Sequence, residues 1–415
     1  MFILIYRLFL LTYSFVIWLA SLFKEKAWLW VKGRKKIFEK IQESLKPNEE
    51  RIWFHCSSVG EFEQARPLIE AIKLNSPNKK IFLTFFSPSG YQLRKNYEQA
   101  DYVFYLPLDG KMNARRLVAL VKPTLVVFVK YEFWYYYLTT LRNNRVPTVL
   151  IAATFRASQP FFKWYGNLHK EMLGCFTQLF LHDEASAKLL EKIGFKENVT
   201  VAGDTRYDRV SEIAQQAKSY SIIEVFKGES KLLIAGSTWQ DDEKILKEVL
   251  STLPSNWKLI LAPHELEASH LQQIINLFGE EAIFYSQFVG NEISKRVLVI
   301  DNMGMLSSIY RYGEIAYVGG GFLKGGIHNT LEPAVFGLPV LFGPVYKKFV
   351  EAVELVDNEF GFPIKDAKEC KTILKKLTED KLFLLEKQKV LRKYMQGHKG
   401  AKDKMMEWLD KNELI

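Results

Sequence analysis

Short apolar runs alternate with amphipathic segments along most of the chain, starting near residue 50. The runs are rich in Val, Ile, Leu and Phe, and the segments between them carry apolar residues at helical spacing. Buried strands joined by crossover helices are typical of a parallel sheet that is covered on both faces. In the first half we expect strands at 51–55, 80–86, 102–105, 124–129, 148–152, 179–182 and 199–202, with helices such as 61–74 and 184–193 between them.

The alternation stops at 209–229, where we expect a polar connecting helix and a linker, and then restarts. The second series predicts strands at 231–235, 258–262, 282–285, 297–300, 315–318 and 340–342, and helices at 242–250, 265–278 and 371–377. The pattern therefore predicts an α/β protein with two doubly wound domains, at 24–208 and 230–379. A last helical segment at 380–415 has room to cross back to the first domain. Ligands of such sheets bind at the carboxyl ends of the strands, so two domains predict a cleft between them.

The N-terminal segment differs from the rest of the chain. Residues 8–23 contain no charged side chain, and a helix over 1–23 is long enough for a hydrocarbon core of about 30 Å. A cleaved signal peptide is the alternative, but the run begins with almost no basic residues and its aromatic character continues through Trp28 and Trp30. We expect an uncleaved anchor over 1–23, either a span or an embedded interfacial helix.

Charge is concentrated beside this segment. The first forty residues contain eight basic and two acidic side chains, a net charge of +6 out of +10 for the whole chain. Basic residues directly after an apolar span, here including Arg34 and Lys35, favour the cytoplasmic side and attract anionic lipid headgroups. No basic–aromatic repeat supports a nucleic-acid partner, so we expect a membrane-surface protein with a cytoplasmic body.

Composition adds limits on the chemistry. The 415 residues, 48% hydrophobic and 25% charged, are typical of a globular protein of about two domains. The three cysteines are far apart and follow no metal-ligand spacing, which predicts buried free thiols in a reducing compartment. We expect no metal site and no cofactor.

The most informative segment is 317–344, in which a strand ends in three glycines and a second glycine pair precedes Asn329 and Glu332. Glycines such as Gly320 and Gly321 allow the backbone to approach an anion closely, and a helix N-terminus supplies free N–H groups. A carboxylate one turn later can accept hydrogen bonds from a ribose diol. A structural turn is the plainer alternative; the cluster as a whole favours a nucleotide-sugar site.

Two glutamates of the first domain are expected at strand ends. In SSVGE, Gly60 can form a tight turn after Ser58, and Glu61 then begins a helix whose dipole stabilises its anion. This position suits either a general base or helix capping. Glu132 follows the fourth strand beside Trp134, where it either takes part in chemistry or pairs with a nearby donor.

In the second domain, Gly236, Ser237 and Thr238 lie between a strand and a helix, where they suit a phosphate oxygen or a capping box. His264 is expected at the end of the next strand, on the ligand rim or in a structural role. Met303 and Gly304 follow a later strand, and their backbone groups can read the edge of a base.

Several motifs in this order resemble the bacterial transferases of 3-deoxy-D-manno-octulosonic acid (Kdo). They are GRKK at 33–36, SVGE at 58–61, TFFSPSGY at 84–91, LPLD at 106–109, the segment with Glu132, AGDTRYD at 202–208, AGST at 235–238, MGML at 303–306 and GGIHNTLEPA at 325–334. The resemblance covers nearly the whole chain. Two positions depart from the pattern: no arginine surrounds His264, and Trp239 stands where histidine is common.

The resemblance implies a GT-B glycosyltransferase with CMP-Kdo as donor and a lipid A precursor as acceptor, acting in lipopolysaccharide synthesis at the bacterial inner membrane. It implies that Glu61 is the general base of an inverting transfer and that Glu132 is a second acid of the site. Ser237, Thr238 and Asn329 would then face the donor phosphate, Met303 and Gly304 the cytosine, and Glu332 the ribose. The alternatives are another GT-B enzyme, either a UDP-sugar lipid glycosyltransferase or an epimerase, and a non-catalytic nucleotide-sugar binding protein.

Overall fold

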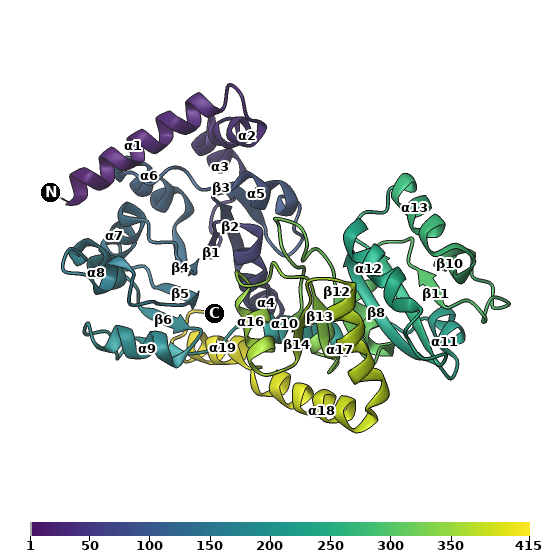
Figure 1. Ribbon diagram of the computed structural model, residues 1–415. Helices are drawn as coiled ribbons and strands as arrows, with labels where there is room; N and C mark the ends of the chain where they lie inside the picture. The colour runs from purple at the N-terminus through teal and green to yellow at the C-terminus, as the bar shows by residue number, and fades with distance from the viewer. Residues whose placement is uncertain (1) are drawn as a thin grey trace. The chain divides into compact units, whose positions relative to one another are not determined.

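The computed structural model describes residues 2–415, which form two compact units (Figure 1). The first unit contains the chain up to Asp208 together with Lys399–Ile415, and the second contains Arg209–His398. Each unit is built around one seven-stranded sheet in which every strand pair is parallel. The α/β, doubly wound prediction is confirmed in both units.

The sheet of the first unit has the strand order β3-β2-β1-β4-β5-β6-β7. Its strands are β1 (Arg51–Cys56), β2 (Lys80–Phe85), β3 (Tyr102–Tyr105), β4 (Pro123–Val129), β5 (Thr148–Ala153), β6 (Gln178–Leu181) and β7 (Val199–Val201). Because β1 and β4 are central, the residues that follow them lie at the middle of the carboxyl edge. That is the point where chain order reverses, and it is where doubly wound sheets bind ligands.

Helices cover both faces of this sheet. The helices of the first unit are α1 (Phe2–Ala20), α2 (Glu25–Arg34), α3 (Ile37–Ser44), α4 (Val59–Asn75), α5 (Pro88–Arg94), α6 (Lys111–Val121), α7 (Tyr135–Asn143), η1 (Pro160–Phe162), α8 (Asn167–Leu173), α9 (Glu184–Glu191) and α19 (Ala401–Lys411). Helix α10 (Thr205–Gln215) begins in the first unit and continues into the second. Side chains alternate along each strand, so β1 sends Trp53 to one core and Ile52 and Phe54 to the other. The two cores fix the sheet from both sides.

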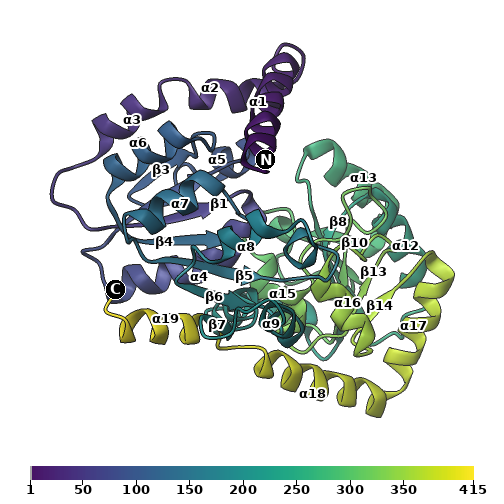
Figure 2. The same ribbon diagram turned by 90° about the vertical axis from the view of Figure 1, so that its left-hand side faces the viewer.

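The C-terminal helix α19 belongs to the first unit, although the chain has passed through the second before reaching it (Figures 1 and 2). The carboxylate of Asp208 accepts the backbone N–H groups of Gly400 at 2.7 Å and Lys402 at 2.9 Å. Met405 and Leu409 of α19 are buried in the core on which α4 packs. A cap and an apolar face therefore hold α19 in place.

The second sheet has the order β10-β11-β9-β8-β12-β13-β14. Its strands are β8 (Lys231–Thr238), β9 (Trp257–Pro263), β10 (Ala282–Phe284), β11 (Val297–Val299), β12 (Ile315–Val318), β13 (Val340–Phe342) and β14 (Gly361–Pro363). Its helices are α11 (Ser221–Lys227), α12 (Gln240–Leu250), α13 (Ala268–Phe278), η2 (Gly279–Glu281), η3 (Tyr285–Gln287), α14 (Leu306–Ile309), η4 (Tyr310–Tyr312), α15 (Leu331–Ala334), α16 (Val350–Asp357), α17 (Ala367–Glu379) and α18 (Lys381–Gly397). Here β8 and β12 are central, so the glycine-rich segment leaves the middle of the sheet.

Helix α1 is the one helix of the described chain that is long and apolar enough to cross a membrane, a property it shares with signal sequences and core helices. One face of it lies against the first unit: Leu10 is buried, Tyr6 contacts the rings of Tyr135 and Tyr136, and Tyr13 stacks on Phe86. The rest of the helix is exposed, including the large apolar side chains Leu4, Leu8, Phe9, Leu11, Phe15 and Trp18. The helix is thus docked along one side and apolar on the other.

Candidate functional site

The first polar centre surrounds Glu61, directly after the central strand β1. Helix α4 begins at Val59, after the N-cap residue Ser58, and places Glu61 in its first turn. The carboxylate accepts the backbone N–H of Ser57. Gly60 is part of the helix rather than a tight turn, and a Cβ there would meet nothing closer than 4.0 Å. The expected tight turn at Gly60 is therefore corrected, since this glycine lies in the first turn of α4.

The electrostatics of Glu61 also differ from expectation. Burial, and after it the negative charge of Glu132, raise the pKa of Glu61 far above the ordinary value of a glutamate. The backbone N–H groups of Ser57 and Ser58 and the charge of Lys130 act in the opposite direction and do not compensate. The helix N-terminus does stabilise the anion, as the sequence predicts, but burial and the charge of Glu132 outweigh this effect. A carboxylate with a raised pKa is a stronger base once it is ionised.

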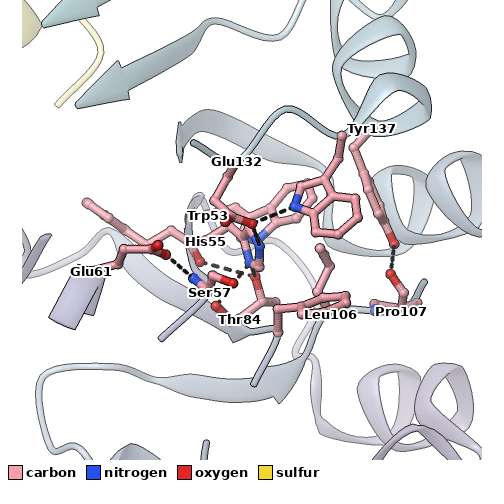
Figure 3. Close-up of polar contacts among 12 residues, drawn as sticks. Trp53, His55, Ser57, Glu61, Thr84, Leu106, Pro107, Glu132 and Tyr137 are labelled. Carbon is pink, nitrogen blue, oxygen red and sulfur yellow. Dashed lines mark hydrogen bonds and ion pairs between the residues drawn. The ribbon is translucent and has the colours of Figure 1, made fainter. Parts of the chain in front are cut away.

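Glu132 lies at the end of a chain of buried hydrogen bonds (Figure 3). Its Oε2 atom lies 2.9 Å from Nε2 of His55 and accepts the indole N–H of Trp134 at 2.6 Å. On the other side of the imidazole, Nδ1 lies 2.9 Å from the hydroxyl of Thr84, which also accepts the indole N–H of Trp53 at 2.8 Å. A carboxylate with two donors on one oxygen is held in a single orientation.

The backbone before Glu132 is in an uncommon conformation. Lys130 has a φ of 59°, in the left-handed region, which costs an ordinary residue roughly 1 kcal/mol. Its N–H still bonds to the carbonyl of Ile151, so the bend follows directly after the last sheet hydrogen bond. Such conformations persist where surrounding contacts hold them, often at functional sites. Here the bend places Glu132 close enough to affect the pKa of Glu61.

Two residues of this centre, His55 and Thr84, were missed by the sequence analysis. Both lie inside strands, and the sheet register places them opposite each other. Each is completely buried, which is uncommon for a histidine in a strand of apolar residues. The sequence does carry a signal for them: His55 and Thr84 are each a polar residue one position before the end of an apolar strand.

Arg34 and Lys35 were expected on the acceptor or membrane side. Lys35 is exposed at the end of α2. Arg34 instead turns inward: its guanidinium donates to the carbonyls of Leu106 and Phe86, both at 2.8 Å, and lies over the ring of Trp30. Burial lowers the pKa of Arg34 to about 9. Arg34 therefore joins α2 to the strand ends of the sheet, and its assignment to a lipid-facing surface is corrected.

In the second unit, Asp242 organises the glycine-rich segment. Its Oδ2 atom accepts the backbone N–H of Gly320 at 2.9 Å and that of Trp239 at 3.0 Å, and Oδ1 accepts the hydroxyl of Tyr317 at 2.7 Å. The backbone is tightly packed here, since a Cβ on Gly321 would lie 2.5 Å from Cα of Gly343. Gly321 is therefore required because the backbone at Gly343 passes too close for a side chain.

The strand end at 236–238 is only partly available to a ligand. Gly236 is buried under the hydroxyl of Tyr310, whereas Ser237 is half-buried with a φ of 55°. Thr238 is completely buried, and its hydroxyl donates to Glu243 at 3.0 Å. The expectation that Thr238 faces a phosphate is therefore corrected, because its hydroxyl is already used inside the unit.

Three aromatic rings form a stack at the rim of the second unit. His264 is exposed and lies between Trp239, at a centroid distance of 4.9 Å, and His328, at 4.3 Å. The indole N–H of Trp239 donates to Nε2 of His328 at 3.2 Å. Burial and the neighbouring His264 lower the pKa of His328 to about 4. His328 is thus a neutral acceptor near pH 7, and the stack holds His264 in place.

The remaining candidate residues lie in two places. Asn329 donates to Glu332 at 3.1 Å, and its side-chain oxygen accepts the N–H of Leu331, so the pair is arranged at the start of α15. Met303 and Gly304 lie in an exposed loop after β11, and Gly304 has a φ of 85°. Within residues 2–415 no group of His, Cys, Asp and Glu side chains is arranged to hold a metal ion.

The architecture and the strand-end polar centres define a protein of the GT-B class. Among solved structures, the chain is similar to UDP-GlcNAc 2-epimerase from Neisseria meningitidis, with a TM-score of 0.60 and 16% identity over 87% of this chain and 100% of that one. It is also similar to Acinetobacter baumannii MurG, with a TM-score of 0.56 and 11% identity over 88% and 99% of the two chains. At these identities the likeness concerns the fold alone.

Sequence relatives identify the family. The family model described as 3-Deoxy-D-manno-octulosonic-acid transferase (kdotransferase) matches residues 32–209. The 3-deoxy-D-manno-octulosonic acid transferase of Aquifex aeolicus is 30% identical over 352 residues, which cover 83% of this chain and 89% of the relative. The enzyme of the same name from Haemophilus influenzae is 29% identical over 75% and 74% of the two chains. The chain therefore belongs to the Kdo transferase family and is a glycosyltransferase.

Proposed function

We propose that this protein transfers Kdo from CMP-Kdo to a lipid A precursor during lipopolysaccharide synthesis, with inversion at the anomeric carbon. The observation that supports this most directly is the pair of Glu61 and Glu132 at the central strand ends of the first unit. Burial raises the pKa of Glu61 toward neutral pH. A general base is most effective when its pKa lies near the pH at which the enzyme works.

In the proposed reaction, Glu61 removes the proton from a sugar hydroxyl of the acceptor. The hydroxyl oxygen forms a bond to the anomeric carbon of Kdo as the bond from that carbon to the phosphate oxygen breaks. CMP leaves with the electron pair, and the proton stays on Glu61. Glu132 is a positioning residue in this scheme, because its charge adds to the effect of burial in raising the pKa of Glu61, and its own orientation is held by His55.

The second unit is proposed to bind the donor. Backbone N–H groups at the start of α12 and in the glycine-rich segment, together with Ser237, can stabilise the phosphate charge that develops as CMP leaves. Asn329 is proposed to face the donor phosphate, Glu332 to contact the ribose, and the loop of Met303 and Gly304 to contact the cytosine. His264, held by its ring stack, is proposed to contact the donor as well. The scheme requires no metal and no cofactor.

The proposed location is the cytoplasmic face of the bacterial inner membrane. A lipid-linked acceptor is confined to the bilayer, so a membrane-bound enzyme meets it at high local concentration. The exposed apolar face of α1 and the basic residues after it supply the two signals that stable attachment requires. Since Tyr6, Leu10 and Tyr13 are docked on the body, an α1 lying in the membrane surface fits these contacts better than a free span.

The direct test incubates the purified full chain with CMP-Kdo and a tetraacylated lipid A precursor, followed by mass analysis of the lipid and measurement of CMP release. We expect the lipid to gain the mass of one or more Kdo residues, with one CMP released for each. Transfer from a UDP-sugar, or CMP release without change of the lipid mass, would contradict the proposal. Transfer from a UDP-sugar would indicate a different GT-B glycosyltransferase activity.

A further inference from the structure

The first unit contains an apolar cavity of about 530 Å³ that none of the proposed catalytic steps uses. Ile5 and Phe9 of α1 line one side of it, and Phe161, Leu168 and Met172 of η1 and α8 line the other. Its volume falls in the range of about 300–1,000 Å³ that is typical of ligand pockets. Its lining is predominantly apolar, so it suits an apolar ligand.

Both rims of the cavity carry apolar side chains that face solvent. On the α1 side, Phe9 is 60% exposed, and it belongs to the exposed apolar face of that helix. On the other side, Trp164 is 89% exposed and Tyr165, which lines the cavity, is 40% exposed. Trp and Tyr are enriched at the level of lipid headgroups. Two separate segments thus place the mouth of this cavity at the same apolar surface.

The cavity also borders the catalytic centre. Tyr131 and Phe133 line it, and these are the two residues on either side of Glu132. Phe133 packs on Phe161 at a ring-centroid distance of 4.8 Å, so the segment with Glu132 is part of the cavity wall. A ligand held here would lie with one end near the membrane side and the other near the reacting group.

We propose that this cavity binds one acyl chain of the lipid acceptor and so places the sugar hydroxyl of that lipid beside Glu61. The inference rests on the proposed function, since it concerns the acceptor of the same reaction. An acyl chain fits because the lining is almost entirely apolar. The rim also carries exposed aromatic side chains, which are common at the surface of a bilayer. Basic side chains directly after α1, such as Lys24 and Lys26, complement the phosphates of the same lipid.

A polar group in the lining supports the same ligand. Nδ1 of His169 is buried and has no hydrogen-bond partner among residues 2–415, and burial lowers the pKa of this imidazole. A neutral histidine can donate one N–H to a carbonyl oxygen. The ester or amide link of an acyl chain carries such an oxygen, whereas a free hydrocarbon does not.

The test uses a tetraacylated lipid A precursor with a photoreactive diazirine in one acyl chain, bound to the full chain in nanodiscs with anionic lipid. The variants Ile5→Trp and Leu168→Trp fill the cavity, and neither residue is buried, so both positions have room for a larger side chain. Asn167→Trp is the matched control, since Asn167 is the exposed neighbour in α8 and does not line the cavity.

We expect the wild type and the control to be labelled in the segments 131–133 and 159–172. In both filling variants, labelling should fall about tenfold or more, because each methylene removed from apolar contact weakens binding by about fourfold. Labelling confined to the outer face of α1, or equal labelling in all four proteins, would overturn the inference.

Kdo transfer measured in the same samples separates this inference from the proposed function. A wild type that transfers Kdo without labelling of the cavity refutes the acyl site alone. A wild type that is labelled in the cavity but transfers no Kdo refutes the proposed function and leaves a lipid-binding site.

Discussion

The hydroxyl of Tyr6 donates a 2.7 Å hydrogen bond to Oδ2 of Asp109, 103 residues further along the chain. The same carboxylate accepts the backbone N–H groups of Tyr136 and Tyr137, both at 3.0 Å, at the start of α7. Burial raises the pKa of Asp109 to about 6, although these three hydrogen bonds favour its anion. One side chain therefore joins the membrane-proximal helix to the helix that follows Glu132.

Removing this link should loosen α1. In Tyr6→Phe the ring contacts remain but the hydrogen bond to the carboxylate is lost, which costs about 1.5–3 kcal/mol for a charged partner. We expect amide hydrogen exchange in α1 and in the first turn of α7 to become roughly tenfold faster or more. Tyr13→Phe, on the same face of α1, is the control and should leave exchange unchanged. Equal effects of both variants would show that ring packing alone docks the helix.

Glu61→Gln should abolish nearly all transfer while CMP binding remains. General base catalysis supplies about 10²–10⁴-fold in rate, so kcat should fall at least a hundredfold. The matched control is Glu63→Gln, two residues along the same helix, where the carboxylate pairs with Arg94 at 2.8 Å. Calorimetry measures CMP affinity in both variants. Normal turnover in Glu61→Gln would remove this residue from the mechanism.

The same substitution should make the protein more stable at neutral and alkaline pH. Because the folded-state pKa of Glu61 is raised, its contribution to stability is fully present below the unfolded-state pKa of about 4.3 and is lost as pH rises to and through the folded value. Glutamine cannot ionise, so it avoids this loss. Urea unfolding at pH 5 and pH 9 should show a much larger gain for Glu61→Gln at the higher pH. A gain of equal size at both values would exclude a charge effect.

The pH dependence of transfer should report the interaction of the two glutamates. Glu61 acts as a base only when ionised, so kcat/KM should fall as pH decreases through its raised pKa. Glu132→Gln removes the charge that raises this pKa, and the acidic limb of the profile should move to lower pH. Glu63→Gln should not move it. An unchanged limb in Glu132→Gln would mean that burial alone sets the basicity of Glu61.

The glycine-rich segment offers a steric test. In Gly321→Ala the new Cβ would lie 2.5 Å from Cα of Gly343, a backbone atom that cannot move alone, and overpacking of this kind costs about 1–3 kcal/mol. We expect a lower urea midpoint and weaker CMP binding. Gly325→Ala is the control, because a Cβ there meets nothing within 4 Å. Equal stability of the two variants would contradict the close approach.

The sequence predicted the strands well because buried parallel strands are short, apolar and clearly separated. Every strand of the first sheet was expected within one or two residues, for example β3 at Tyr102–Tyr105. The strand that was missed, β14, has three residues, begins with glycine and ends with proline, so it carries no periodic signal. In the expected linker, α11 forms at Ser221–Lys227 because Ile223 and Phe226 are buried in the second core.

Side-chain chemistry was harder to predict, because it depends on residues that are distant in sequence. The position of Glu61 in the first turn of α4 was expected, but its raised pKa was not, because that depends on its burial and on Glu132, 71 positions later. Thr238 seemed to be a ligand for phosphate, and only the packing shows that Glu243 already accepts its hydroxyl. Arg34 looked like one basic residue among several until Leu106 and Phe86 supplied its acceptors.

The return of α19 to the first unit has a consequence for how this protein is made. Trp408 of this helix contacts the ring of Phe180 at 5.7 Å, and its Met405 and Leu409 complete one of the two cores. A ribosome makes residues 401–411 only after the whole second unit, Arg209–His398. The first unit, although its synthesis begins first, therefore stays open on one side of its sheet until residues 401–411 have been made, after the second unit.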